Sequence, residues 1–130
     1  MRLPPHFDME SFPQQELTLG NEHCAFLTIP GREVLAGSGL IVPFESRATV
    51  FDLTEVEWAA TFELLHQAKA WIDARYAPDG YNIGWNVGRV GGQTIPQAHL
   101  HVVPRFADEP LAGKGIRYHL KQDENRRPGG

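Results

Sequence analysis

The sequence predicts a single α+β domain in which an antiparallel sheet of about five strands carries one long helix on one face. Short strand-like segments come before and after one helical segment, without the strand and helix alternation of a parallel sheet. A length of 130 residues and a mass of 14.5 kDa suit one compact unit. Residues 1–130 are therefore expected to form one domain.

The first part of the chain is expected to be an irregular arm over residues 1–15, because its prolines are incompatible with a regular helix. Strands should follow where β-branched and aromatic residues lie between Gly, Asn and Pro. These predicted strands cover residues 16–19, 24–29 and 39–43.

One helix is predicted, and its start is well defined. The Thr54 hydroxyl can cap the first turn, Glu57 completes a capping box, and Leu53 can pack against Trp58. Apolar residues then recur at helical spacing until Pro-Asp-Gly at residues 78–80 ends the run. The residues expected to pack on the sheet are Val56, Ala59, Ala60, Leu64, Ala68, Trp71 and Ile72, and Trp58 is a further candidate for the core.

Two more strands are predicted after the helix, at residues 81–87 and 98–104. The loop between them contains three glycines within residues 88–92. Residues 107–130 form a C-terminal tail that is locally basic from Gly113 onward. We expect these charges to be solvated.

Composition and charge exclude several functional classes. A formal charge of −4 disfavours binding to a nucleic-acid duplex, whereas a small phosphorylated ligand needs only local donors. No apolar run approaches the roughly 20 residues of a membrane span, and the N-terminus lacks the layout of a signal peptide. The single cysteine, Cys24, is expected to be a small buried residue. These features indicate a cytoplasmic protein.

Two histidines and a glutamine share one face of the last predicted strand. Because side chains alternate along a strand, Gln97, His99 and His101 should point to one side, and the residues between them are apolar. Three polar side chains are costly to bury without partners, so this face is expected to line an open cleft.

A glycine-rich turn lies just upstream of the histidines. Gly91 and Gly92 allow backbone amides to point into a concavity, and the Gln93 amide and Thr94 hydroxyl add donors for phosphate oxygens. Beside two histidines, this turn indicates a phosphate-binding site.

These segments resemble the signature of the histidine-triad (HIT) family. The matching residues are Asn86-Val87-Gly88, Gly92-Gln93-Thr94, Gln97-Ala98-His99-Leu100-His101-Val102-Val103 and Pro104-Arg105. The family pattern is His-φ-His-φ-His-φ-φ, where φ is hydrophobic. This chain keeps the second and third histidines as His99 and His101 and has Gln97 in place of the first. The resemblance extends over residues 37–105.

The resemblance implies a nucleotide hydrolase or nucleotidyl transferase. His99 would attack the α-phosphorus of a purine nucleoside phosphate, such as a dinucleoside polyphosphate or a nucleoside phosphoramidate, and form a covalent nucleotidyl-histidine intermediate. His101 would donate a hydrogen bond or a proton to the reacting group. The residues expected to bind substrate are Asn86, Gly92, Gln93, Thr94 and Gln97.

The resemblance also implies a homodimer. No cofactor is expected for the nucleophilic attack, although Mg²⁺ could bind a polyphosphate leaving group. Relatives carry a ribose-binding Asp or Asn where this chain has Pro30, for which Glu33 is a candidate substitute. Ser38 and Ser46 occupy positions where relatives often have histidines.

Two alternatives stay open. In the first, the chain is a catalytically weak or inactive nucleotide-binding module that lost turnover through the residues at positions 30, 38 and 97. In the second, His99 and His101 bind a metal ion together with a third ligand. That ligand would be an acidic residue or one of His6, His23, His66 and His119.

Overall fold

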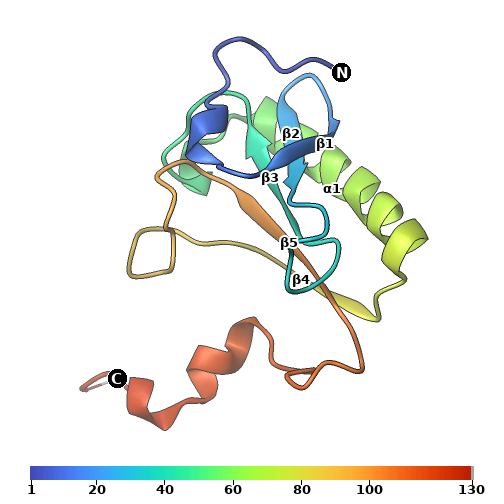
Figure 1. The fold of residues 1–130 in the computed structure, drawn as a ribbon. Coiled ribbons are helices and arrows are strands. Elements are labelled where there is room, and N and C mark those ends of the chain that lie inside the picture. The colour runs from blue at the N-terminus through green and yellow to red at the C-terminus, as the bar shows by residue number, and fades with distance from the viewer. Residues whose placement is uncertain (130) are drawn as a thin grey trace.

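The fold is a five-stranded antiparallel sheet with one long helix on one face, as the sequence predicts (Figure 1). The computed structural model describes residues 1–129. The order of strands across the sheet is β1-β2-β3-β5-β4. The strands are β1 (Glu16–Gly20), β2 (Cys24–Thr28), β3 (Gly39–Pro43), β4 (Gly80–Trp85) and β5 (Leu100–Arg105), and the helix is α1 (Glu55–Tyr76).

Helix α1 begins where the sequence predicts, with a complete capping box. Thr54 Oγ1 accepts a hydrogen bond from the Glu57 amide at 3.1 Å, and the Glu57 carboxylate accepts one from the Thr54 amide at 2.8 Å. Arg47 Nε also donates to Glu57 at 3.0 Å, so this buried carboxylate is paired. The helix ends at Ala77, which is left-handed with φ 47°, just before Pro78. No helix within residues 1–129 combines the length and apolar content needed to cross a bilayer.

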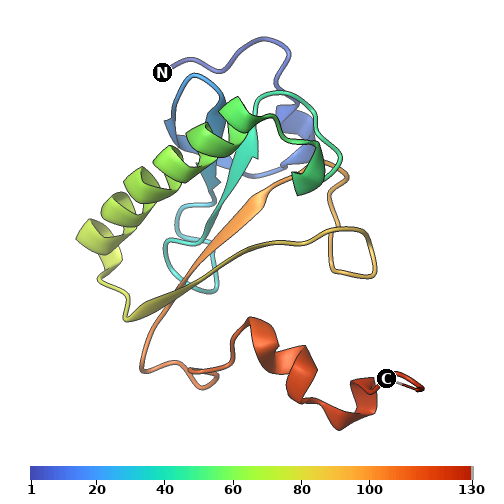
Figure 2. The ribbon, with the colours of Figure 1, turned by 180° about the vertical axis from the view of Figure 1, so that it is seen from behind.

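Helix α1 covers one face of the sheet, which Figure 2 shows from the helix side. The core between helix and sheet consists of Cys24, Phe26, Ile41, Ala60, Leu64, Ala68, Ile72, Leu100 and Val102. The predicted packing on the sheet is therefore confirmed for Ala60, Leu64, Ala68, Trp71 and Ile72. The prediction is wrong for Val56 and Trp58, which are 55% and 48% exposed, and for Ala59, which is also exposed. The Trp58 ring lies at the rim of the sheet instead, 6.0 Å from the ring of Trp85.

The N-terminal arm covers part of the second face of the sheet. Phe7 and Phe12 stack on each other with ring centroids 6.3 Å apart, and Phe7 meets Phe44 edge-on at 5.8 Å. The arm is irregular, as predicted, apart from one 3-10 turn at Met9–Ser11. Its aromatic side chains hold it on a second core whose sheet residues are Ala25, Leu27, Val42 and Phe44.

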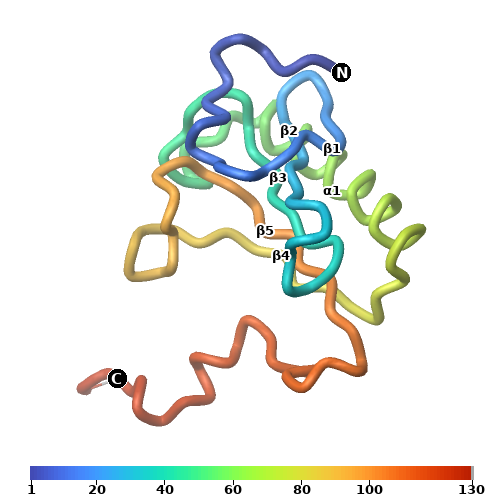
Figure 3. The backbone as a smooth tube through the Cα atoms, in the orientation of Figure 1, coloured from blue at the N-terminus to red at the C-terminus, as the bar shows by residue number. Residues whose placement is uncertain are grey.

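The C-terminal tail leaves β5 and turns back below β4 (Figure 3). It contains two short 3-10 helices, η3 (Ile116–Lys121) and η4 (Asp123–Asn125), and neither has a buried residue. The tail is thus exposed, as the sequence predicts. It nevertheless follows a defined path, because Arg105 on β5 donates hydrogen bonds to the carbonyl oxygens of Leu111 and Lys114.

Replacing Thr54 with alanine should lower the free energy of unfolding by about 1 kcal/mol, because the Glu57 amide loses its acceptor in the first turn of α1. Urea unfolding followed by circular dichroism measures this change. Ser46→Ala is the matched control, since Ser46 is exposed and its side chain has no hydrogen bond within residues 1–129. Equal stability of the two variants would contradict the capping role.

Candidate active site

The candidate site forms at the start of β5, where His99 and His101 lie side by side. Their ring centroids are 4.8 Å apart and their planes are inclined by 66°. His101 pairs in register with Gly84 on β4. Its neighbours Leu100 and Val102 pack under α1, and because side chains alternate along a strand, the His101 side chain points to the opposite face of the sheet. The Ala98 amide donates to the Arg47 carbonyl at 2.7 Å, which holds the segment before the strand in place.

One hydrogen bond fixes both the orientation and the tautomer of His99. Its Nδ1 lies 2.7 Å from the carbonyl oxygen of Gln97. Because a carbonyl oxygen can only accept, Nδ1 must carry the hydrogen in this contact. In the neutral ring Nε2 then keeps its lone pair, which is the state that a nucleophilic histidine requires near pH 7.

The N-terminal arm closes over His99, so the prediction of an open cleft is wrong at this residue. The ring of Phe12 meets the ring of His99 edge to face, with centroids 6.0 Å apart. Phe12 is 1% exposed and His99 is 5% exposed. Aromatic contacts from a distant segment supply packing that the local pattern does not reveal.

Gln97 is also buried, with an exposed fraction of 3%. Within residues 1–129, neither the nitrogen nor the oxygen of its side-chain amide has a hydrogen-bond partner. Burying an unpaired polar group costs about 1–3 kcal/mol. The expectation that this cost keeps the whole face open is therefore wrong, and the fold retains a donor and an acceptor that no other residue uses.

A cavity of about 190 Å³ opens at His101. His101 Nε2 is buried and has no hydrogen-bond partner within residues 1–129. Burial, and to a smaller extent the neighbouring His99, lowers the pKa of His101 below its ordinary value. The ring is therefore neutral at pH 7 and has one N–H to donate. The other residues around the cavity include Asn82, Gly84, Trp85, Asn86, Val103 and Ile116.

The glycine-rich turn is tied to the rest of the fold by Gln93. Its side-chain nitrogen donates to the carbonyl oxygens of Ala48 and Ile95 at 2.8 and 3.1 Å, and its side-chain oxygen accepts from the Gly88 amide at 2.9 Å. The sequence predicts that the Gln93 side-chain amide donates to phosphate oxygens, but these contacts already use both its nitrogen and its oxygen. In the structure, the Gln93 side chain holds the turn in shape.

Asn86 links this turn to the histidines. Its Nδ2 donates to the Gly92 carbonyl at 3.4 Å, and its side chain lines the His101 cavity. Gly92 has a φ of 99°, a conformation that favours glycine. Thr94 lines a different cavity, of about 310 Å³, together with Gln93. Of the turn residues predicted to bind substrate, the structure therefore places Asn86 at His101 and Thr94 in a separate hollow.

Sequence reasoning missed two residues that border the histidine pair, Phe12 on the arm and Ile116 on the tail. Neither lies in a segment with helical or strand periodicity, and no motif places either residue near residues 97–101. The one available signal for Phe12 is an aromatic residue in a polar, proline-rich stretch, and this signal does not identify its contact.

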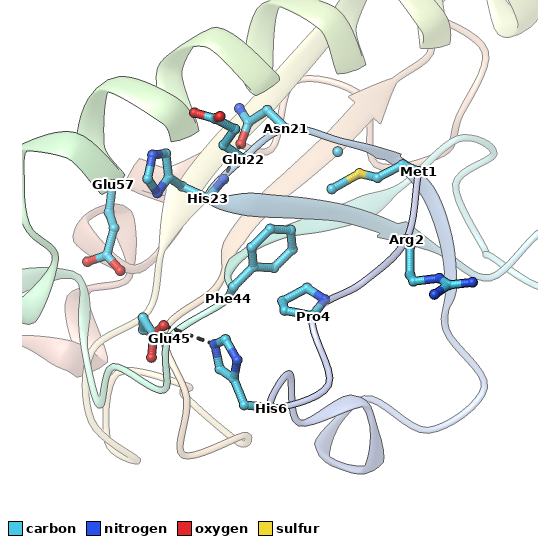
Figure 4. Close-up of a pocket in the computed structure, with 11 residues that line it drawn as sticks. Met1, Arg2, Pro4, His6, Asn21, Glu22, His23, Phe44, Glu45 and Glu57 are labelled. Atoms are coloured by element: carbon cyan, nitrogen blue, oxygen red, sulfur yellow. Dashed lines mark hydrogen bonds and ion pairs between the residues drawn. The ribbon is translucent and has the colours of Figure 1, made fainter.

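A larger cavity of about 500 Å³ lies under the N-terminal arm. Figure 4 shows His6 facing Glu45 there, and the His6 Nε2 and Glu45 Oε1 atoms are 2.9 Å apart. Neither His99 nor His101 lines this cavity. Throughout residues 1–129, no group of three or more His, Cys, Asp or Glu side chains is placed to hold a metal ion.

Lowering the pH should destabilise the protein partly through His101. Burial lowers its pKa in the folded state, so the unfolded chain takes up the proton first as the pH falls. Stability that is fully present above the ordinary pKa of about 6.5 is then lost below it. Urea unfolding at about pH 7.5 and about pH 5 should show a smaller acid loss in His101→Asn than in the wild type. The same loss in both proteins would contradict this assignment.

The amino-acid sequence is similar to a known domain family and to proteins of known activity. Residues 21–108 match the HIT domain. A bis(5'-nucleosyl)-tetraphosphatase (asymmetrical) of Schizosaccharomyces pombe is 30% identical over 74 residues, covering 57% of this chain and 41% of that protein. An AP-4-A phosphorylase of Mycobacterium tuberculosis is 32% identical over 96 residues, covering 69% of this chain and 49% of that protein. The chain thus spans less than half the length of these two relatives.

The fold is also similar to solved structures. A HIT family protein from Bacillus anthracis superimposes with a TM-score of 0.68 at 23% identity, covering 90% of this chain and 84% of that chain. The sequence match includes both histidines, the turn before them and helix α1. By sequence over most of its length and by fold, the chain belongs to the HIT domain family.

Proposed function

We propose that the chain is a nucleotide hydrolase or nucleotidyl transferase that acts at the α-phosphate of a purine nucleoside phosphate. The substrate is of the dinucleoside polyphosphate or nucleoside phosphoramidate type. The observation that carries the proposal is the 2.7 Å contact between His99 Nδ1 and the Gln97 carbonyl, which leaves Nε2 as the free nitrogen. Relatives about 30% identical that are named as a tetraphosphatase and an AP-4-A phosphorylase support a nucleotide substrate.

The proposed reaction has two steps. In the first, His99 Nε2 attacks the α-phosphorus, a P–N bond forms, and the bond from phosphorus to the leaving group breaks. The leaving group departs with the bonding electron pair, and His101 donates a hydrogen bond to it. In the second step water attacks phosphorus, the P–N electron pair returns to His99, and the proton lost by water passes to solvent. Attack by another acceptor in this step gives transfer in place of hydrolysis.

The proposal assigns substrate binding to the residues that surround this pair. Gln97 stands in place of the first histidine of the triad, and its unpaired amide can donate to or accept from a phosphate group without titrating. Asn86 lines the same cavity as His101. Gly92 and Thr94 belong to the adjoining turn, where the Thr94 hydroxyl faces its own cavity as a further donor, and Gln93 holds that turn in place.

No metal ion is required for the proposed attack, because a neutral imidazole nitrogen needs no deprotonation before it reacts. Mg²⁺ bound to a polyphosphate leaving group is compatible with this scheme, since it would neutralise charge on the departing oxygens. The metal would then arrive with the substrate, not as a resident cofactor.

Trapping the covalent intermediate tests the proposal. The protein is mixed with a dinucleoside polyphosphate or nucleoside phosphoramidate labelled at the α-phosphate, quenched in alkali, and digested for peptide mapping. We expect label on the peptide containing His99 and none in His99→Ala or His99→Asn, with turnover reduced by at least about 10³-fold in both variants. The second variant retains a polar side chain and controls for misfolding.

A nucleotide-binding module would give a different result. It would bind a nucleoside monophosphate with equal affinity in the wild type and in His99→Asn, would take no label, and would turn over neither substrate. The buried position of His99 and the glutamine at position 97 are the features that favour this alternative. That outcome would replace the catalytic proposal with a binding function.

We further propose that the chain forms a homodimer through β4 and α1. Within residues 1–129, β4 pairs only with β5, so one edge of the sheet is free. Beside it lies a cavity of about 300 Å³ with an almost entirely apolar lining that includes Phe62, Leu65 and Ile83. Phe62 is 65% exposed. A second copy of the same edge and groove would cover these apolar side chains.

Sedimentation velocity at micromolar concentration should show a dimer. Phe62→Glu should shift it to monomer, because a carboxylate would have to lose its hydration when the apolar groove is covered. Leu120→Glu adds the same charge to an exposed apolar residue on the tail and should leave the dimer intact. A wild-type protein that sediments only as a monomer would overturn the proposed dimer.

A further inference from the structure

The C-terminal tail is fixed to β5 by Arg105. Its guanidinium contacts the Glu109 carboxylate through Nε at 2.8 Å and Nη2 at 2.5 Å, and it donates to Asn82 Oδ1 on β4. The Arg105 and Glu109 side chains are only 17% and 12% exposed. Both donors meet the same oxygen, Glu109 Oε1, and the second oxygen accepts from the Phe106 amide at 2.8 Å, so both carboxylate oxygens are held in place. Together with hydrogen bonds to the Leu111 and Lys114 carbonyls, this ion pair sets the path of the tail.

This path brings Ile116 to the histidine site. A Cβ added to Gly84 would lie 3.7 Å from Ile116 Cδ1, and Gly84 pairs in register with His101. Ile116 and His101 line the same cavity. Phe12 packs on the neighbouring His99. A group that extends from His99 past His101 therefore meets the tail.

The tail next to this cavity is positively charged, although the protein as a whole has a formal charge of −4. Between residues 110 and 121 the chain contains Lys114, Arg117 and Lys121 and no Asp or Glu. Arg117 and Lys121 belong to η3, whose first residue is Ile116. Both side chains are exposed and have no ion pair within residues 1–129.

We propose that the tail from Lys114 to Lys121 is a polyanion-binding segment that holds a polyphosphate leaving group beside His101. This inference rests on the proposed function, in which the leaving group departs past His101. A polyphosphate carries several negative charges, which the cations of η3 can pair. It also leaves as an anion without taking up a proton, which suits a neutral histidine that donates only a hydrogen bond. An amine leaving group has neither property, so the site should prefer polyphosphates to phosphoramidates.

Nucleotide binding tests this inference without turnover. Calorimetry with the His99→Ala protein compares ATP, which carries the leaving polyphosphate, with AMP, which lacks it. We expect ATP to bind about tenfold more tightly than AMP at low salt, and this preference to shrink as the salt concentration rises. Arg117→Gln/Lys121→Gln should remove most of the preference and leave the affinity for AMP unchanged.

Arg2→Gln/Arg75→Gln is the matched control, because it removes the same charge from two exposed arginines outside the tail that have no ion pair within residues 1–129. This control should keep the preference for ATP. Equal binding of ATP and AMP by the parent protein, or equal losses in the two double variants, would overturn the inference. A protein that binds neither nucleotide would overturn the proposed function and the inference together.

Turnover separates the two proposals further. With His99 present, Arg117→Gln/Lys121→Gln should lower kcat/KM about tenfold for a dinucleoside polyphosphate and less than about twofold for a nucleoside phosphoramidate. Equal losses for both substrates would show that the tail does not act on the leaving group. A protein that prefers ATP in the binding assay but turns over neither substrate would keep the polyanion site and refute the catalytic proposal.

Discussion

The hydrogen bond between His99 Nδ1 and the Gln97 carbonyl is the contact on which the candidate site depends. Imidazole has two nitrogens that exchange roles between tautomers, and only the nitrogen without hydrogen can attack phosphorus. A backbone carbonyl two residues earlier removes this ambiguity, because it can accept but not donate. The position of that carbonyl is fixed in turn, since the amide of Ala98 donates to Arg47 and Arg47 pairs with the helix-capping Glu57. The helix start and His99 thus belong to one connected set of polar contacts.

The sheet face opposite the helix is divided between two segments from the ends of the chain. The arm packs on β2 and β3 and carries Phe12 to His99. The tail, held by Arg105, carries Ile116 to the cavity at His101. The histidine pair therefore sits at the boundary between an apolar cover and a basic one. This asymmetry gives the two histidines different surroundings.

The relatives share the central part of the chain and its fold, while the match to the family ends at residue 108. The tail beyond that point is therefore where this protein can differ from other HIT domains. The histidine site itself contains buried polar groups that have no hydrogen-bond partner within residues 1–129, at Gln97 and His101. Three of the four such atoms in this part of the chain belong to these two residues, and the fourth is Gln15 Oε1. This concentration is consistent with a cost in stability that is retained at a functional site.

The sequence alone determined the secondary-structure elements and the placement of His99 and His101 side by side at the last strand. The helix start at Thr54 and the order of strands follow from local hydrogen bonding and from periodicity, which act over a few residues and can be read along the chain. The same locality explains the errors. The sequence made Trp58 a candidate for the core, but its place at the rim depends on where the helix crosses the sheet.

Only the tertiary structure decided what surrounds the site. The burial of His99, the use of the Gln93 amide within the turn and the approach of the tail to His101 each join residues far apart in the chain. No local pattern encodes these contacts, because they arise from packing between segments that have no periodicity of their own. The sequence thus specified the two neighbouring histidines. Packing decided that the arm covers His99 and that a cavity opens at His101.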